Sequence, residues 1–209
     1  IILANIGTTM KGAVDNVDTI REILRDLALP SFYIHCDAAL SGMILPFVKD
    51  PEPYDFAAGI DSIAVSGHKM IGSPMPCGIV LAKKTNVDRI ARSIEYIGSL
   101  DTTISGSRNG LSPLFLWSAI RKLGRSGFRD MVVGCLKMAD YAIERFRDEG
   151  VKAWRNNNSV TIVFPRPVEP VVEKWQIAVS EDIGHVITMP HVTREQVDEL
   201  VRDIAGAKP

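Results

Sequence analysis

Four short apolar runs divide the first part of the chain, at Ile1–Ile6, Ser31–Cys36, Ile63–Val65 and Gly78–Ala82. Near-continuous apolar runs of this length are typical of strands that are buried on both faces. Between the first two runs, apolar residues recur at helical spacing. They predict a helix from an N-cap at Asp15 to about Leu27. Strands that alternate with helices predict an α/β fold with a mostly parallel sheet.

The second part of the chain has a different pattern. A helical spacing begins at Leu111 and continues through Trp117, Ile120 and Leu123, and the segment Gly124–Gly127 interrupts it. After the interruption, the pattern predicts three helices and two strands. The helices are expected at Leu136–Arg147, at Val171–Val179 and from a capping box at Thr193 and Gln196 through Ile204, and the strands at Val160–Phe164 and His185–Met189. We therefore expect one unit over residues 1–125 and a compact α+β unit over residues 126–209.

Three of the predicted strands end in small polar clusters. These clusters are Gly7-Thr8-Thr9, Asp37-Ala38-Ala39 and His68-Lys69. The carboxyl ends of parallel strands share one edge of a sheet, where ligands bind, so we expect the clusters to lie side by side.

A lysine and an aspartate at neighbouring strand ends suit pyridoxal phosphate. Burial at the end of a strand would lower the pKa of Lys69, and its neutral amine could hold the cofactor aldehyde. Asp37 would pair with the pyridine nitrogen, and Ala39, on the same strand face, would leave room for a flat ring. His35 shares that face. The alternative is that Lys69 is a surface lysine, Asp37 a turn residue and His68 a structural histidine.

Composition and charge exclude several other classes of function. The hydrophobic content of 46%, the charged content of 23% and the net charge of −1 indicate a globular protein without a basic surface for nucleic acid. No apolar run is long enough to span a membrane. Three separated cysteines without CxxC spacing favour a reducing, cytoplasmic environment over disulfides or a zinc site.

Longer motifs around the clusters resemble the group II pyridoxal-phosphate amino acid decarboxylases, and most of all the bacterial histidine decarboxylases of that group. The resemblance rests on five stretches and runs over nearly the whole chain. The stretches are Asn5–Thr9 with Gly12–Asp15, His35–Ala39, Ser66–Gly78, Thr103–Gly110, and Ala153–Asn156 with Ser159–Pro165.

The resemblance implies a fold-type I pyridoxal enzyme that acts as a homodimer and decarboxylates L-histidine to histamine. Residues 1–125 would be the later part of the cofactor-binding large domain and residues 126–209 the small domain. Lys69 would form the internal aldimine, Asp37 would pair with the pyridine nitrogen and Ala39 would contact the ring. The other implied cofactor residues are Thr9 near the 3-hydroxyl, and Ser66 and His68 at the phosphate, with His68 also a candidate for proton transfer.

The resemblance also places the segment Thr103–Gly110 near the partner subunit's site, where Ser105 or Ser107 would contact the phosphate or the substrate. The alternative for this segment is a loop without a ligand. Family members carry a ring-stacking histidine and further phosphate ligands before the region that matches Ile1. We therefore expect the sequence to begin inside a longer protein and its sheet to have an exposed apolar edge.

Three readings of the function stay open. One is decarboxylation of histidine, serine, an aromatic amino acid or glutamate. Another is transamination, with Arg108 or Arg155 binding the substrate carboxylate, and a third is a fragment with a structural role only. Hydroxyl groups in the segment Ser105–Arg108 suit an imidazole or a serine substrate, whereas an open apolar pocket there suits an aromatic ring.

Overall fold

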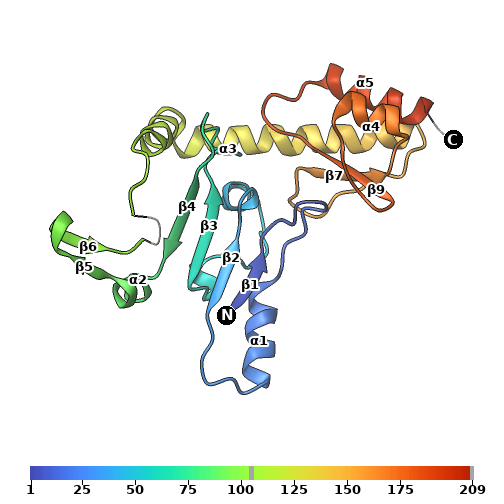
Figure 1. Ribbon diagram of the computed structural model, residues 1–209. Helices are drawn as coiled ribbons and strands as arrows, with labels where there is room; N and C mark the ends of the chain where they lie inside the picture. Colours follow the sequence, from blue (N-terminus) through green and yellow to red (C-terminus); the bar gives the residue numbers. More distant parts are fainter. Residues whose placement is uncertain (104–105, 208–209) are drawn as a thin grey trace.

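The computed structural model describes residues 1–103 and 106–207. Its front part is a four-stranded sheet in the order β1-β2-β3-β4 (Figure 1). The strands are β1 (Ile2–Asn5), β2 (Ile34–Asp37), β3 (Ser62–Ser66) and β4 (Gly78–Ala82). The first three strands are parallel, as the sequence predicts, and β4 runs antiparallel to β3. A short loop joins β3 to β4 without a crossover helix, and such a connection permits only an antiparallel neighbour.

One face of this sheet packs on helix α1 (Val17–Asp26). Alternation along the strands directs Ala4, Ile34 and Cys36 into that core, where each is fully buried. The helix begins one residue later than predicted, because Asn16 is the N-cap and accepts a 2.9 Å hydrogen bond from Thr19 N–H. Asp15 has another role: its carboxylate accepts a 2.8 Å hydrogen bond from Asn5 N–H at the end of β1.

The opposite face of the sheet is exposed among the described residues. Leu3 on β1 is 60% exposed and Val80 on β4 is 65% exposed. His35 and Asp37 project from β2 to this side, and His35 Nδ1 lies 2.7 Å from Ser62 Oγ. Apolar side chains are therefore exposed on this face of the sheet, whereas the expectation from the sequence concerned the edge of the sheet.

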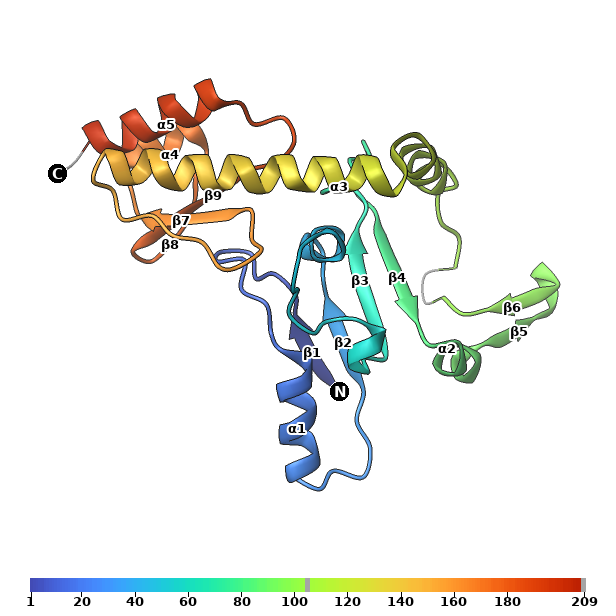
Figure 2. The same cartoon turned by 180° about the vertical axis from the view of Figure 1, so that it is seen from behind.

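An arm extends from the end of β4, away from the rest of the chain (Figures 1 and 2). It consists of helix α2 (Lys84–Ile90) and a hairpin of β5 (Arg92–Ile94) and β6 (Ser99–Asp101). Four short 3₁₀ turns complete the front part, at Ser41–Met43, Leu45–Phe47, Phe56–Ala58 and Glu95–Ile97. The helix and hairpin of this arm were not predicted from the sequence.

Helix α3 (Leu111–Asp148) joins the front part to the tail and has one break. At Gly124, φ is 59° and ψ is −174°, so the backbone leaves the helical path there and then resumes it. This break lies in the segment Gly124–Gly127, near which the sequence analysis divides the chain into two units. The prediction that the next helix starts at Leu136 is wrong, since Phe128, Val132 and Cys135 already bury one face of the helix before that point.

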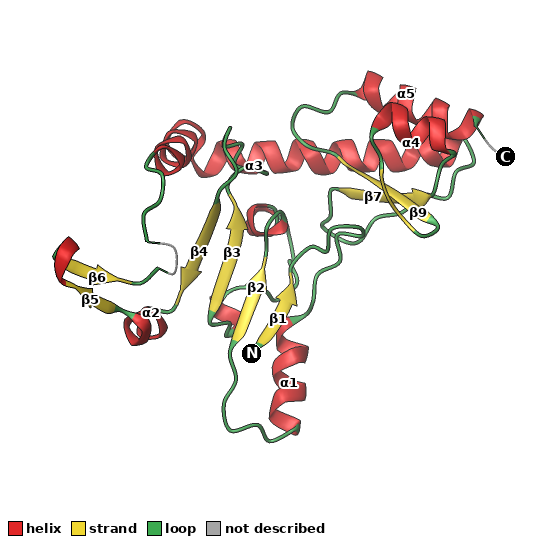
Figure 3. Ribbon diagram, viewed as in Figure 1, coloured by secondary structure: helices red, strands yellow, loops and turns green. Residues whose placement is uncertain are grey.

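The tail packs a three-stranded sheet against α3, α4 (Glu169–Trp175) and α5 (Arg194–Gly206) (Figure 3). The sheet has the order β7-β9-β8, with β7 at Thr161–Pro165, β8 at Ala178–Ser180 and β9 at Ile183–Ile187. The capping box of Thr193 and Gln196 is confirmed. The predicted helix Val171–Val179 is too long, because Gln176 adopts a left-handed conformation and the following residues pair with β9. The strand predicted at His185–Met189 begins and ends two residues earlier.

A third apolar cluster connects the front part and the tail. It buries Ile44 and Met70 from the front part against Val132, Cys135 and Val160. The two larger cores are separate from it and from each other. None of the helices that the structure describes is both long and apolar enough to cross a membrane.

Candidate active site

A cavity of about 210 Å³ lies where the strand ends of the front sheet meet the tail. All three polar clusters predicted from the sequence contribute to its wall. The lining residues are Asn5, Gly7, Thr8, Thr9, Gly12, Asp37, Ala39, Leu40, Ser41, Lys69, Thr161 and Ile187. Four of the predicted site residues, Thr9, Asp37, Ala39 and Lys69, are therefore together at one place.

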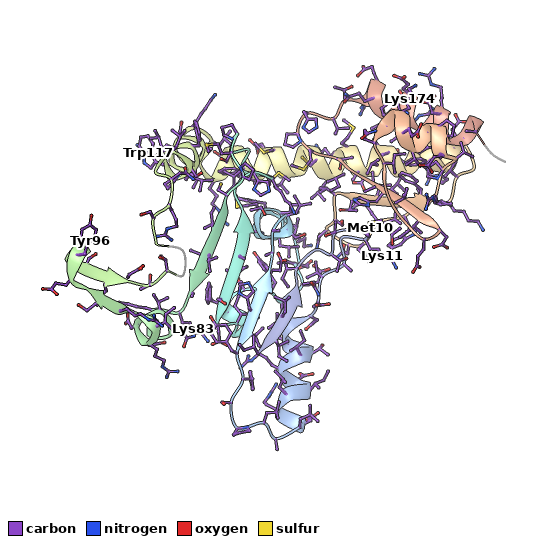
Figure 4. All side chains as sticks on the ribbon, in the orientation of Figure 1. Met10, Lys11, Lys83, Tyr96, Trp117 and Lys174 are labelled. Atoms are coloured by element: carbon purple, nitrogen blue, oxygen red, sulfur yellow. The ribbon has the colours of Figure 1, made fainter. Side chains whose placement is uncertain are left out.

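The loop Gly7–Ala13 forms one side of the cavity, and hydrogen bonds within the loop hold its shape. Gly7 N–H and Thr8 N–H donate to Ala13 O at 3.0 and 2.9 Å, and Ala13 N–H donates to Thr8 Oγ1 at 3.1 Å. From the tail, Asn156 Nδ2 donates to Lys11 O at 2.8 Å. Met10 and Lys11 accordingly lie at the junction between the two parts (Figure 4).

Two positions in this loop require glycine, because neighbouring side chains lie close to the loop backbone. Gly7 has φ of +99°, and a side chain there would overlap Ser41 Oγ. Gly12 has φ of +61°, and a side chain there would overlap Ser159 Oγ and come within 3.2 Å of Thr161 Cβ. The loop is therefore held between Ser41 on one side and the first residues of the tail sheet on the other.

Asp37 ends β2 and turns its carboxylate back onto the chain. Its Oδ1 accepts a 3.2 Å hydrogen bond from Ala39 N–H, which fixes the carboxylate while Asp37 remains exposed. Ala39 is in turn held to β3, because its carbonyl accepts a 3.0 Å bond from Ser66 N–H. One carboxylate oxygen is thus used by the backbone, and the other is available to a ligand.

Lys69 is positioned by its neighbours in sequence. Met70 and Ile71 are 2% and 5% exposed, so they anchor the turn that follows β3. Lys69 itself is exposed and lines the cavity, and no ion pair joins it to a carboxylate among the described residues. The burial that the strand-end argument predicts for this lysine is therefore not present.

His68 is not one of the residues that line the cavity, and the next loop holds its ring. His68 Nδ1 lies 3.1 Å from both the backbone N–H and the carbonyl oxygen of Cys77, so the backbone of Cys77 holds the ring in either tautomer. Gly67 N–H donates to Cys77 O at 2.9 Å, and Gly67 has no room for a side chain beside Cys77 Sγ. Ser66 and His68 are not among the cavity residues.

The predicted residues of the segment before α3 are only partly described. Ser107 is exposed and is not one of the residues that line the cavity. Ser105 lies outside the described residues. Arg155, one of the two arginines considered for a substrate carboxylate, pairs instead with Asp140 and donates to Ser159 O at 2.9 Å.

Three residues of the cavity match the aldehyde, the pyridine nitrogen and the flat ring of pyridoxal phosphate. Lys69 offers a primary amine, Asp37 a free carboxylate oxygen for a pyridine N–H, and Ala39 a small surface for a ring. Four further lining residues were not identified from the sequence as site residues: Leu40, Ser41, Thr161 and Ile187. The one available signal was a hydroxyl at Thr161 inside an otherwise apolar strand.

Comparison with known proteins agrees with this geometry. The sequence model of the pyridoxal-dependent decarboxylase conserved domain matches residues 1–165. Histidine decarboxylases from Vibrio campbellii and Pseudomonas entomophila are 55% and 49% identical over 98% of this chain. The match covers 54% and 51% of those relatives, so the chain spans about half their length.

Solved structures show the same fold. L-methionine decarboxylase from Streptomyces sp. 590 superposes with a TM-score of 0.82 and 28% identity, over 99% of this chain and 54% of that one. Glutamate decarboxylase from Lactobacillus brevis gives 0.82 at 18% identity, with 99% and 54% coverage. The fold is thus that of fold-type I pyridoxal enzymes. With the family match over most of its length and a lysine and an aspartate in one cavity, the chain belongs to the pyridoxal-dependent decarboxylases.

Proposed function

We propose that this chain is the part of a pyridoxal-phosphate enzyme that contains the cofactor-binding lysine. We propose that the enzyme decarboxylates L-histidine to histamine and carbon dioxide. The observation that carries the proposal is the shared cavity of Lys69, Asp37, Ala39 and Thr9. The choice of histidine is supported by relatives at 49–55% identity that are histidine decarboxylases.

The residues of the cavity take distinct parts in this reaction. When bound, pyridoxal phosphate supplies the electron sink for the carbanion that forms as the carboxylate leaves. Asp37 accepts the pyridine N–H with its free oxygen and so keeps that proton on the ring. Lys69 provides the amine that holds the cofactor aldehyde and that exchanges with the amine of the substrate. Thr9 offers its hydroxyl to the 3-hydroxyl side of the ring.

Ser66 and His68 are proposed as phosphate ligands, and His68 also as a proton donor. The backbone of Cys77 engages Nδ1 of the ring, so we assign the phosphate contact and the proton transfer to Nε2. Neither residue lines the cavity of this chain, so their roles need the rest of the enzyme around the phosphate.

Trapping of the cofactor lysine tests the proposal directly. The full-length protein is incubated with pyridoxal phosphate, reduced with borohydride and mapped by mass spectrometry. We expect the pyridoxyl group on Lys69 and its loss in Lys69→Arg. The matched control is Lys84→Arg, an exposed lysine paired with Asp88 on α2. An adduct elsewhere, or none, contradicts the assignment of Lys69.

A product assay over a panel of amino acids separates the reactions and substrates. We expect histamine from histidine. Ethanolamine from serine, an aromatic amine or a product of glutamate would change the substrate, and a keto acid would indicate transamination. The ion pair of Arg155 with Asp140 argues against its use for a substrate carboxylate.

We also propose that the enzyme is a homodimer, in which the arm and the first turns of α3 contact the second subunit. Apolar residues recur every third position on the exposed side of this helix: Leu111, Leu114, Trp117 and Ile120, which are 46%, 54%, 61% and 49% exposed. Tyr96 on the hairpin is 96% exposed (Figure 4). Apolar patches of this kind mark contact surfaces. Ser107 follows the hairpin and would reach the partner's site from there.

Sedimentation velocity of the full-length protein tests the dimer. We expect Trp117→Arg to shift the protein towards monomer, because it places a charge in the apolar patch. The adjacent exposed residue gives a matched control, Ser118→Arg, which should remain dimeric. Equal behaviour of the two variants would contradict this interface. A cytoplasmic location, which the three unpaired cysteines favour, is part of the same proposal.

A further inference from the structure

The tail holds the loop Gly7–Ala13 through a hydrogen bond as well as through packing. Asn156, in the turn before β7, donates from Nδ2 to the carbonyl oxygen of Lys11 at 2.8 Å. The other hydrogen bonds that the structure shows for this loop join residues of the loop itself. Within residues 1–103 and 106–207, Asn156 is therefore the one side chain of the tail that is hydrogen bonded to the loop.

The carbonyl group of Lys11 belongs to the same turn as Thr9. Gly12 N–H donates to Thr8 O at 2.7 Å and closes the turn Thr8–Gly12, which contains both residues. Thr9 lines the candidate cavity, and Lys11 does not. A turn closed in this way moves as one piece, so a bond that fixes Lys11 O also fixes the position of Thr9 in the wall of the cavity.

The backbone that carries Asn156 is itself held in place. It begins a turn in which Ser159 N–H donates to Asn156 O at 3.3 Å. Arg155 Nη1 donates to Ser159 O at 2.9 Å, and the same guanidinium pairs with Asp140 on α3. A side chain on a fixed turn loses less conformational freedom when it forms a hydrogen bond. The bond from Asn156 therefore connects the loop to a fixed part of the tail.

We propose that Asn156 is a positioning residue of the cofactor site, which holds Lys11 O and thereby sets the place of Thr9 in the cavity. It acts through the loop, because it is not one of the residues that line the cavity. The amide group suits this role, since it donates a hydrogen bond without carrying a charge. An ionised aspartate has the same shape but can only accept, so it would repel the carbonyl oxygen. The inference rests on the proposed function and adds a residue of the tail to the support of the site.

The test uses the full-length protein and the variant Asn156→Asp. The matched control is Asn157→Asp, which adds the same charge at the next, exposed position. The Kd of pyridoxal phosphate is measured by fluorescence titration of the apoenzyme, and hydrogen exchange of the loop amides by mass spectrometry. We expect Asn156→Asp to raise the Kd by about 2- to 10-fold, the value of one hydrogen bond, and to speed exchange in the loop Gly7–Ala13. Asn157→Asp should match the wild type in both measurements.

The two measurements together distinguish positioning from a general structural role. If Asn156→Asp speeds exchange throughout the protein, Asn156→Ala repeats the comparison, since it removes the donor without adding a charge. If that variant also loosens the whole protein, Asn156 is structural and the proposal fails. Faster exchange in the loop with an unchanged cofactor Kd overturns it too, as does equal behaviour of Asn156→Asp and Asn157→Asp. A wild type that binds no cofactor overturns the proposed function together with this inference, and that result is seen before any variant is compared.

Discussion

Replacement of Gly7 by alanine should destabilise the protein through two separable effects. The backbone effect comes from φ of +99°, where a residue with a side chain is strained by about 1–3 kcal/mol. The packing effect comes from the new Cβ, which would lie 3.1 Å from Ser41 Cβ and overlap Ser41 Oγ. Overpacking in a closed site costs about 1–3 kcal/mol. We therefore expect Gly7→Ala to lower the free energy of unfolding by about 2–6 kcal/mol.

Gly72→Ala is the matched control for the backbone effect. Gly72 also has a positive φ, +80°, but a Cβ there meets nothing within 4 Å. The free energy of unfolding of this variant should fall only by the cost of the backbone strain, about 1–3 kcal/mol. The double variant Gly7→Ala/Ser41→Gly removes the overlapping atoms, so a double-mutant cycle should recover a favourable coupling of about 1–3 kcal/mol.

Urea unfolding of the full-length apoenzyme compares five proteins on one scale: the wild type, Gly7→Ala, Gly72→Ala, Ser41→Gly, which completes the cycle, and the double variant. Since the stability of a domain is only about 5–15 kcal/mol, a loss at the upper end would leave a population that is partly unfolded at room temperature. The reasoning is refuted if Gly7→Ala costs no more than Gly72→Ala, or if the cycle shows no coupling with Ser41. Either result would mean that the loop moves freely away from Ser41.

Three further predictions concern the core and the titratable groups. Burial lowers the pKa of His185 in the folded protein below its usual value of 6.5. The neutral His185 ring therefore contributes fully to the stability of the fold above pH 6.5, and this contribution is lost as the pH falls through the pKa of the folded state. Melting temperatures from neutral to mildly acidic pH should show this slope, and it should flatten in His185→Gln but not in His191→Gln, a change at an exposed site. Burial also raises the pKa of Cys36 to about 11, so a maleimide should label Cys77 in the native protein and Cys36 only after unfolding. Phe146 is fully buried and packs on Phe164, with the ring centroids 5.1 Å apart. Phe146→Ala should lower the free energy of unfolding in urea by about 3–5 kcal/mol, and a loss below about 1 kcal/mol would contradict this packing.

The sequence predicted the structure well where a hydrophobic pattern and the chemistry of the residues beside it point to the same feature. The apolar runs Ile1–Ile6, Ser31–Cys36 and Ile63–Val65 form parallel strands, and residues of the polar clusters that follow them line one cavity. The capping box at Thr193 is present because both of its partners lie within one turn, so the local sequence contains the whole motif. The domain boundary near residue 125, like the role of each site residue, stays a prediction.

Other features depend on partners far away in the sequence. Asp15 has the residue type of an N-cap, but the end of β1 recruits its carboxylate. Val179 extends a helical pattern, and only the pairing of β8 with β9 makes it part of a strand. Ser41 and Thr161 carry no motif of their own. They become site residues because the tail is packed onto the loop Gly7–Ala13.

The packing of the tail on this loop also bears on the order of folding. The cavity joins Gly7 near the start of the chain to Ile187 near its end, and closing so long a loop is entropically costly before both surrounding cores exist. The front sheet with α1 and the tail sheet with α5 can each form from contacts nearer in sequence. The cofactor site is therefore expected to appear late, when Met70 and Val132 come together in the third cluster. Binding of the cofactor would then select chains in which both parts have folded.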